Sequence, residues 1–597
     1  MIDPNGGYME YLDRKTQNGL KEKDSMDPRN IVTGNEIPKE GYCDQPYVVF
    51  TRDGDWLCVL TTGPGLEGDA RQHVVSTVSK DQGKSWSPLV DIEPNGPPEA
   101  SWVMPLAVPS GRLYAFYVHN SDNLREVPSP AGPPIKRVDT LGHLVFKYSD
   151  DNGQTWSDER YDIPLRTTEI DRNNATGGEV LFFWGVGKPK IHEQEEAVSF
   201  GVAKVGNFVP NGFMDPSEGI FLKSTNILTE SDPAKIRWEM LPDGDVGLRA
   251  PWGPIADEHN LVPLNDGSLY CTYRTIDGFL CGAYSRDGGH TWDGPQHATY
   301  TPGGRKIKHP RAANFVWKAS NGKYLLWYHN HGGKYYMDRN PAWLSGGVER
   351  DGHIYWSQPE IVLYDDNPAT RMSYPDFIEQ DGRYWITETQ KTIARSHAID
   401  PDLLNGLWNQ AENRTVATDG LALDLSCEQC APGATATMPS LQSLADGGGF
   451  AIDLWVTPDD LSREQIIFDT RNRYGRGITL ALRPEGTLRI IIGDRFIEHW
   501  WDSDPGLLQP GRTHHVAVIV DGGPKIITFV VDGVLNDGGA DRPKGWSRFP
   551  ADMGEVNGMP EFTIDSGLTS KLHRLRVYDR PLRTSEAVGN AQAGLSA

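Results

Sequence analysis

Residues that could move protons or bind anions recur at the starts of short apolar segments, often beside a proline. Each of these segments reads as the innermost strand of a repeated unit, so we expect the side chains to meet around one axis. The set combines carboxylates, a tyrosine, an arginine and a histidine, which are groups used in acid–base catalysis, nucleophilic attack and anion binding. Its members are Asp44, Trp102, Lys188, Glu258, His309, Arg311, Tyr374 and Asp376, with Arg274 and Arg339 farther along the same units.

A short repeat, Ser-x-Asp-x-Gly-x-Ser/Thr-Trp, marks the elements that must position these residues. Its copies begin at Ser79, Ser149 and Ser285, and the second interval is about twice the first. A degraded copy is therefore expected between them, and the segment from Ser224 to Trp238 is the candidate. Asp and Gly favour a tight turn capped by the carboxylate, and the Trp can pack that turn onto a strand. We expect the repeat to be structural and none of its residues to be catalytic.

Hairpins with glycine turns interleave with this repeat. The turns are Asp53-Gly54, Ser110-Gly111, Asp266-Gly267, Asn321-Gly322 and Asp381-Gly382. Together with the unit that starts near Lys188, they define six units with room for four short strands each. Repetition of this kind is typical of a β-propeller. We predict an all-β chain in which residues 1–412 form a six-bladed β-propeller, with residues 1–43 completing the last blade.

The C-terminal part of the chain has longer strands. Apolar segments at 450–456, 514–522, 527–533 and 572–578 resemble the laminin-G/concanavalin-type jelly roll, an accessory domain of carbohydrate enzymes. We predict a β-sandwich over residues 413–597 that binds glycan or stabilises the chain and holds no catalytic residue. Its removal is expected to leave turnover of a small aryl glycoside intact. No cofactor is expected to be required; such domains often carry structural calcium, although no run of calcium ligands stands out here.

Charge and composition restrict the partners. The 597 residues carry a formal net charge of −23, which argues against a nucleic-acid partner. No apolar run approaches the roughly 18 residues of a membrane span, so no membrane partner is expected. The first forty residues contain no apolar signal core. Two alternatives stay open: a secreted or periplasmic protein whose signal peptide is absent from this chain, and a cytoplasmic one. The six cysteines are expected to be free thiols.

The three repeats are Asp-boxes, and through them the chain resembles the sialidase-like superfamily of glycoside hydrolases. That family places a Glu at an inner strand start, followed by a hairpin, an Arg and an Asp-box. Glu258, Arg274 and the Asp-box at Ser285 follow that order. The resemblance implies that Glu258 activates the nucleophile and that Arg274 binds the substrate.

The same resemblance assigns further roles. A late arginine followed by a nucleophilic tyrosine matches Arg339 and Tyr374. The acid/base aspartate lies in the loop before the first Asp-box strand, where Asp69 is the match. The remaining inner residues are expected to bind substrate: Arg311, His309, Trp102, Lys188 and Asp376.

Asp44 departs from the family pattern. The family begins its first blade with Arg-Ile-Pro, whose arginine grips the substrate carboxylate, whereas this chain has Asp44-Gln45-Pro46. A carboxylate there would repel an anionic sugar unless a cation or a proton intervened. The sugar could then be neutral or differently charged, and Asp44, Asp69 and Glu258 could support a two-carboxylate mechanism.

The sequence therefore predicts an exo-acting glycoside hydrolase that removes a terminal sugar from a glycan or polysaccharide. One alternative is a polysaccharide lyase, in which Tyr374 or His309 abstracts a proton and Arg311 and Arg339 neutralise a uronate. Another is a non-catalytic carbohydrate-binding propeller. The sequence does not indicate the sugar, the linkage or the oligomeric state.

Overall fold

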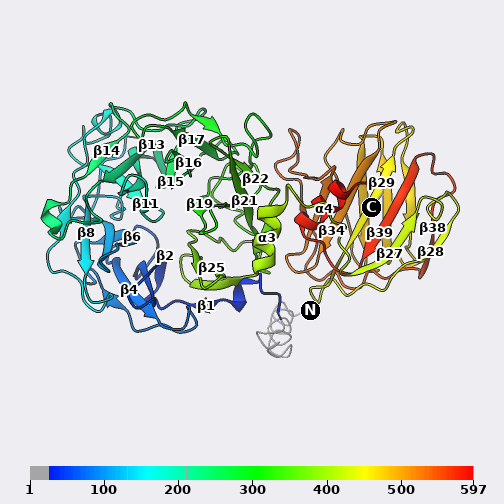
Figure 1. Ribbon diagram of the computed structural model, residues 1–597, viewed down its shortest axis with the longest axis horizontal. Coiled ribbons are helices and arrows are strands. Elements are labelled where there is room, and N and C mark those ends of the chain that lie inside the picture. The colour runs from blue at the N-terminus through cyan, green and yellow to red at the C-terminus, as the bar shows by residue number, and fades with distance from the viewer. Residues whose placement is uncertain (1–25, 131, 210–212, 596–597) are drawn as a thin grey trace, which may run out of the picture.

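The computed structural model describes residues 26–130, 132–209 and 213–595. Two bodies lie side by side: sheets arranged around a common centre on the left of Figure 1, and a sandwich of sheets on the right. Strands dominate both bodies, which confirms the all-β prediction. The α-helices of the described residues are α2 (Glu169–Arg172), α3 (Pro401–Asn409) and α4 (Thr584–Ala593).

In the part of the chain that the structure describes, six antiparallel sheets of four or five strands make up the first body. The first sheet contains β2 (Tyr42–Phe50), β3 (Trp56–Gly63), β4 (His73–Ser79) and β5 (Val90–Asp91). The second contains β6 (Ala100–Ala107), β7 (Leu113–His119), β8 (His143–Ser149) and β9 (Tyr161–Asp162). The third contains β10 (Phe182–Gly185), β11 (Lys190–His192), β12 (Ala197–Val209), β13 (Phe213–Ser224) and β14 (Glu239–Leu241).

The remaining three sheets follow in chain order. The fourth contains β15 (Asp257–Pro263), β16 (Leu269–Arg274), β17 (Cys281–Ser285) and β18 (Gln296–His297). The fifth contains β19 (Phe315–Lys318), β20 (Tyr324–Tyr328), β21 (Ala342–Arg350), β22 (His353–Trp356) and β23 (Glu360–Leu363). The sixth contains β24 (Phe377–Gln380), β25 (Arg383–Thr389) and β26 (Ala394–Ile399).

The sixth sheet takes its outermost strand from the other end of the chain. β1 (Asn35–Glu36) pairs antiparallel with β26, with Asn35 opposite Ser396 and Glu36 opposite Arg395. The predicted contribution of the N-terminal segment to the last unit is confirmed for these residues, while residues 1–25 lie outside the described part. Among the strands that are described, no sheet closes on itself.

The Asp-boxes are turn structures, as predicted. In the second box, Asp151 accepts hydrogen bonds from Ser149 Oγ at 2.8 Å and from Thr155 N and Oγ1 at 2.9 and 2.6 Å. The boxes at Asp81 and Asp287 show the same bonds. The tryptophan of a box packs on the preceding sheet: Trp156 Nε1 donates to Ser76 Oγ at 3.0 Å. Each box therefore joins two neighbouring sheets.

The second body is a sandwich of β-sheets. One sheet runs β27 (Leu421–Ser426), β39 (Lys571–Tyr578), β29 (Gly449–Thr457), β34 (His514–Asp521), β35 (Ile526–Val531) and β36 (Val534–Leu535), with β37 (Ser547–Arg548) beside β35. The other contains β30 (Gln465–Asp469), β31 (Gly477–Arg483), β32 (Thr487–Gly493) and β33 (Glu498–Asp502). A two-stranded sheet pairs β28 (Thr435–Thr437) with β38 (Glu561–Thr563). Aliphatic side chains from these sheets form one buried core.

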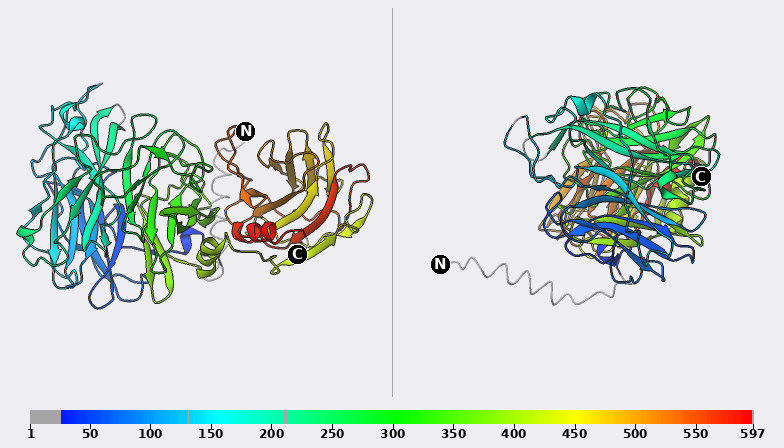
Figure 2. Two further views of the ribbon diagram at one scale, coloured as in Figure 1. Left: turned by 45° about the horizontal axis from the view of Figure 1, so that its top comes forward. Right: turned by 90° about the vertical axis from the view of Figure 1, so that its left-hand side faces the viewer.

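The two bodies share a buried interface, which Figure 2 shows from a second direction. Trp343 and Ile361 from the fifth sheet belong to one apolar cluster with Ile519 and Val588 of the sandwich. The buried carboxylate of Glu360 accepts the backbone N–H groups at the start of α4, at 3.0 and 2.7 Å. Because this contact is apolar at its centre and Glu360 bonds across it, the bodies are expected to move as one unit. The boundary between residues 412 and 413 stays a prediction.

The six cysteines are free, and five of them are buried. This agrees with the predicted thiols. Within residues 26–130, 132–209 and 213–595, no helix has both the length and the apolar character needed to cross a membrane.

Candidate functional site

Residues in left-handed backbone geometry lie close to the starts of four inner strands. Gln45, Trp102, Glu258 and Tyr374 have φ values of 54°, 62°, 58° and 45°. At three of these positions the strand pairing shifts register, which marks a β-bulge. Non-glycine residues adopt this conformation at a cost of about 1–2 kcal/mol each, so its recurrence indicates a requirement of the site. The bulges re-aim the side chains relative to the sheet.

Tyr374 and Glu258 form the central pair. The Tyr374 hydroxyl donates to Glu258 Oε1 at 2.6 Å, and both side chains are buried. Burial raises the pKa of the Glu258 carboxyl above its usual range, although the neighbouring Arg274 opposes this. Burial and the Glu258 carboxylate raise the pKa of Tyr374 well above 10. The tyrosine is therefore a neutral phenol, and the carboxylate beside it is placed to accept its proton.

Arginines surround this pair. Arg274 Nη1 lies 2.8 Å from Glu258 Oε2, and its Nε bonds to Asp257. Arg339 donates from Nη1 to Ser373 Oγ at 2.5 Å and from Nε to the Tyr336 carbonyl at 2.9 Å. These backbone and side-chain bonds fix the direction of each guanidinium.

A cavity of about 270 Å³ lies over the pair. Its wall contains five cations and the ring of Tyr374, and the carboxylate among its lining residues is Glu67. The cations are Arg274, Arg311, Arg339, Arg371 and Lys391. In a chain with a net charge of −23, such a concentration of positive charge in one hollow favours an anionic ligand. The predicted Arg274, Arg311, Arg339, Tyr374 and Glu258 are thus brought together.

Asp44 is paired with a cation that the sequence analysis did not identify. Lys391, in the turn between β25 and β26, places its Nζ 2.5 Å from Asp44 Oδ2 and 3.0 Å from Glu67 Oε2. The same Nζ lies 4.2 Å from the centre of the Tyr374 ring. Tyr42 also donates to Asp44, at 2.8 Å. The charge of Asp44 is therefore compensated, and the repulsion expected between Asp44 and an anionic sugar does not follow.

Asp69 does not line the cavity. It is exposed, and its carboxylate accepts the N–H of Leu66 at 2.7 Å within its own loop. Glu67, two residues earlier in this loop, reaches the cavity in its place and also pairs with Arg137 at 2.8 Å. Burial would raise the pKa of Glu67, but Lys391 and Arg137 hold it well below its usual range. The loop therefore supplies a carboxylate, but from a different position than predicted.

Four predicted substrate-binding residues lie outside the cavity wall. Trp102 packs edge-on against the Tyr374 ring, with centroids 6.1 Å apart, and supports it. His309 uses both ring nitrogens on backbone groups, with Ala312 O at 2.7 Å and His329 N at 3.3 Å. Both side chains are buried and stabilise the structure around them.

Lys188 and Asp376 pair with each other instead. Lys188 Nζ lies 2.7 Å from Asp376 Oδ2, which also accepts the Val48 N–H. Lys188 lines a larger hollow of about 610 Å³, whose wall includes the turn after β15. That turn is at the opposite end of β15 from Glu258, so this hollow is separate from the cavity. The sequence analysis expects all of these residues to meet in one pocket. Lys188 and Asp376 do not reach the cavity, because Lys188 lines the hollow at the other end of the inner strands.

Glu67, Lys391 and Arg371 are the site residues that the sequence analysis missed. The sequence could have indicated Glu67, because it lies in the same loop as Asp69, where the family resemblance implies the acid/base carboxylate. Lys391 and Arg371 lie in connecting segments next to β25 and β24. No sequence motif identifies such positions, because how the sheets assemble decides whether these side chains reach the cavity.

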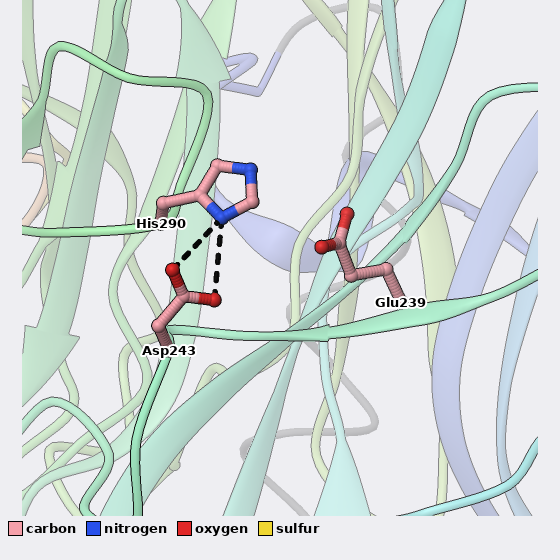
Figure 3. Close-up of side chains that lie close together, drawn as sticks. All are labelled: Glu239, Asp243 and His290. Carbon is pink, nitrogen blue, oxygen red and sulfur yellow. Dashed lines mark hydrogen bonds and ion pairs between the residues drawn. The ribbon is translucent and has the colours of Figure 1, made fainter.

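One further group could hold a metal ion. Glu239, Asp243 and His290 place one ligand atom each within 4.8 Å of one another (Figure 3). His290 Nδ1 lies 3.2 Å from both carboxylate oxygens of Asp243, so an ion pair accounts for two of the three. The group shares no residue with the cavity, and both carboxylates are exposed.

Comparison with known proteins divides the chain in the same way as the fold. Residues 102–386 match the family model of the BNR repeat-like domain, and residues 432–587 match that of the concanavalin A-like lectin/glucanases superfamily. The chain carries a BNR repeat-like domain and a concanavalin A-like domain. The resemblance indicated by the Asp-boxes and by the C-terminal strands is confirmed. These domains support a glycoside hydrolase-like or carbohydrate-binding function.

Solved structures show more distant likenesses. A protein of unknown function from Dyadobacter fermentans is 17% identical over 61% of this chain and 97% of its own, with a TM-score of 0.45. Trypanosoma rangeli sialidase is 13% identical over 93% of this chain and 94% of its own, with a TM-score of 0.42. The Hadza microbial sialidase Hz136 is 16% identical over 60% and 66%, also with a TM-score of 0.42. No curated protein matches the chain.

Proposed function

We propose that the BNR repeat-like domain is an exo-acting glycoside hydrolase whose substrate is a terminal sugar bearing a carboxylate. In this proposal the six sheets are the blades of one β-propeller, with β1 completing the last blade, and the cavity lies at its axis. The observation that carries the proposal is the 2.6 Å bond from Tyr374, which lines the cavity together with four arginines, to the buried Glu258.

The proposal makes Tyr374 the nucleophile and Glu258 its base, and the bond between them supports it. Tyr374 attacks the anomeric carbon while its proton passes to Glu258 Oε1. A neutral phenol suits an anionic sugar, because a carboxylate nucleophile would be repelled by the substrate's charge; sialidases are the known case of a tyrosine nucleophile among glycosidases. Burial raises the pKa of Glu258, and Arg274, 2.8 Å away, opposes this and favours the ionised form that accepts the proton.

In this proposal Glu67 is the proton donor for the leaving oxygen, since Glu67 lines the cavity and Asp69 does not. In the free protein Lys391 and Arg137 hold the pKa of Glu67 low, against the effect of its burial. A substrate carboxylate that pairs with Lys391 would offset part of that effect. The pKa of Glu67 would then rise when substrate binds, which is the condition for a general acid.

The size of the cavity favours one sugar over a chain. Small-molecule sites typically measure about 300–1,000 Å³, and this one is slightly below that range. A hollow of this size would accept the terminal residue of a glycan and leave the rest of the chain outside, which is the arrangement of an exo-acting enzyme.

A lyase remains the second candidate, because Tyr374 beside Arg339 and Arg311 could also abstract a proton next to a neutralised uronate. His309 no longer supports this reading, since both its nitrogens are engaged. A carbohydrate-binding propeller without activity is the third.

A panel of aryl glycosides separates these candidates. It should include sialic acid and uronic acids, with rhamnose and arabinose as neutral controls. Aryl release from the anionic members alone supports the hydrolase. A new ultraviolet absorbance from a C=C bond, formed from a uronate-containing polysaccharide, would indicate the lyase. Binding of the sugar without either signal would indicate a carbohydrate-binding protein without enzymatic activity.

A further inference from the structure

The segment 535–548 of the concanavalin A-like domain, called here the clamp segment, lies against two loops of the propeller. One is the segment 308–312, which carries Arg311, and the other is the loop 329–341 between β20 and β21, which carries Arg339. Both arginines line the cavity. The clamp segment therefore contacts the supports of the substrate site without entering it.

Lys308 anchors the first loop. Its Nζ donates to three carbonyl oxygens of the clamp segment: Asp537 at 2.8 Å, Gly539 at 2.6 Å and Arg542 at 2.7 Å. An ammonium group has three donors, so this buried charge is fully satisfied by the other domain. Arg311 follows three residues later, after a turn that His309 closes on the Ala312 carbonyl.

The second loop is held near both of its ends. Trp546 Nε1 donates to the Asn330 carbonyl at 3.1 Å, and the Gly332 N–H donates to the Pro543 carbonyl at 2.6 Å. At the other end, Arg548 Nη2 donates to the Asn340 carbonyl at 3.1 Å. Asn340 directly follows Arg339, so the last of these bonds fixes the backbone beside the substrate-binding arginine.

The two loops also contact each other. Arg339 Nη2 lies 3.5 Å from the Arg311 carbonyl, and the His329 N–H donates to His309 Nδ1 at 3.3 Å. Movement of either loop would therefore shift both guanidinium groups. An error of about 1 Å in such positions can cost about a hundredfold in rate.

The clamp segment is rigid within its own domain. The buried carboxylate of Asp504 accepts the N–H groups of Asp537 and Gly538, at 3.1 and 2.9 Å, and pairs with Arg542 at 2.5 Å. Asp504 in turn donates its own N–H to Asn536 at 2.8 Å. A preformed loop can position its neighbours, because it does not have to be ordered by the contact itself.

We propose that the clamp segment positions Arg311 and Arg339, so that the concanavalin A-like domain is needed for efficient turnover even of a small substrate. The inference rests on the proposed function for its effect on catalysis. It replaces the expectation that removing this domain leaves turnover of small glycosides intact.

Two variants of the full-length chain test the proposal. Trp546→Phe removes the indole N–H and one of the two fused rings but keeps an aromatic side chain, whereas Lys308→Met removes three bonds with little change in length. Arg583→Ala is the matched control, because Arg583 pairs with Asp400 at the same domain interface but contacts neither loop. The measurements are amide hydrogen exchange over residues 308–312 and 329–341, and kcat and KM for a small anionic aryl glycoside.

We expect both clamp variants to speed exchange in the two loops and to raise KM, by roughly 3–10-fold for Trp546→Phe and more for Lys308→Met. The control should leave loop exchange and KM within twofold of wild type. If folded Trp546→Phe and Lys308→Met keep wild-type exchange and kinetics, the proposal is wrong. Absence of turnover in the wild type would instead contradict the proposed function, while exchange would still show whether the clamp holds the loops.

Discussion

The ammonium group of Lys391 lies 2.5 Å from the carboxylate of Asp44, although 347 residues separate them in the chain. Asp44 stands where the sialidase-like pattern has an arginine, and Lys391 supplies the positive charge from the turn between β25 and β26 instead. Asp44 is buried and receives a second bond from Tyr42. The pair thus restores a cation at the substrate cavity by a different route.

Lys391→Met should raise KM for an anionic sugar by about 10–100-fold, the effect of losing one hydrogen bond to a charged group. Asp44→Asn should change KM by less than about threefold, because the lysine remains and is released from its partner. Steady-state kinetics on both variants measure this. The double variant Lys391→Met/Asp44→Asn leaves no unpaired charge at Asp44 and controls for folding. A larger effect of Asp44→Asn than of Lys391→Met would contradict the role given to the lysine.

The proton donor is tested by a pair of substitutions in one loop. Glu67→Gln should lower kcat by about 10²–10⁴-fold for a poor leaving group, because general acid catalysis contributes that much. Asp69→Asn should stay near wild type, since this side chain only accepts the Leu66 N–H. An activated aryl leaving group needs little protonation and should rescue Glu67→Gln. If Asp69→Asn loses kcat and Glu67→Gln stays near wild type, the proton donor is Asp69 and not Glu67.

The pH dependence follows from the buried base. Glu258 must be ionised to accept the tyrosine proton, and burial raises its pKa. As the pH falls through that raised value, kcat/KM should fall, so the acid limb should lie above the 4.5 of an ordinary glutamate. A pH profile of kcat/KM measures the limb, provided that circular dichroism shows the protein folded throughout. A limb at or below pH 4.5 would not agree with Glu258 as the base.

Asp151 illustrates a purely structural carboxylate. Its bonds to Ser149 and Thr155 close the second Asp-box turn, which lies outside the cavity. Asp151→Ala should lower the free energy of unfolding by about 1–2 kcal/mol and leave kcat/KM unchanged. Denaturant unfolding and kinetics on one preparation check both. A clear loss of kcat/KM in a folded variant would show that the box does more than hold the turn.

Local features of the chain could be predicted because their causes are local. Each Asp-box carries its own turn, cap and packing residue within eight positions, so the repeat and its structural role are readable in the sequence. The order of Glu258, Arg274, Arg339 and Tyr374 along the chain likewise predicted that these residues meet at one site.

The remaining parts depend on tertiary arrangement. Lys391 and Glu67 reach the cavity only through the fold of a hairpin turn and a loop, and neither position differs from an ordinary surface residue in the sequence. Lys308 reads as another surface lysine, yet its three partners come from a domain more than 200 residues away. Left-handed residues such as Glu258 and Tyr374 were identified as candidates without any sign of their backbone geometry.

The central claim is that Tyr374 is the nucleophile. An activated fluoro-sugar of the anionic class turned over by the wild type should trap the glycosyl–enzyme intermediate, and peptide mass spectrometry would locate it. The account predicts the added mass on Tyr374, its absence in Tyr374→Phe, and slower labelling in Glu258→Gln. Labelling of Glu258, Asp44 or Glu67 instead, with Tyr374→Phe keeping near wild-type kcat, would contradict the account and indicate a two-carboxylate mechanism.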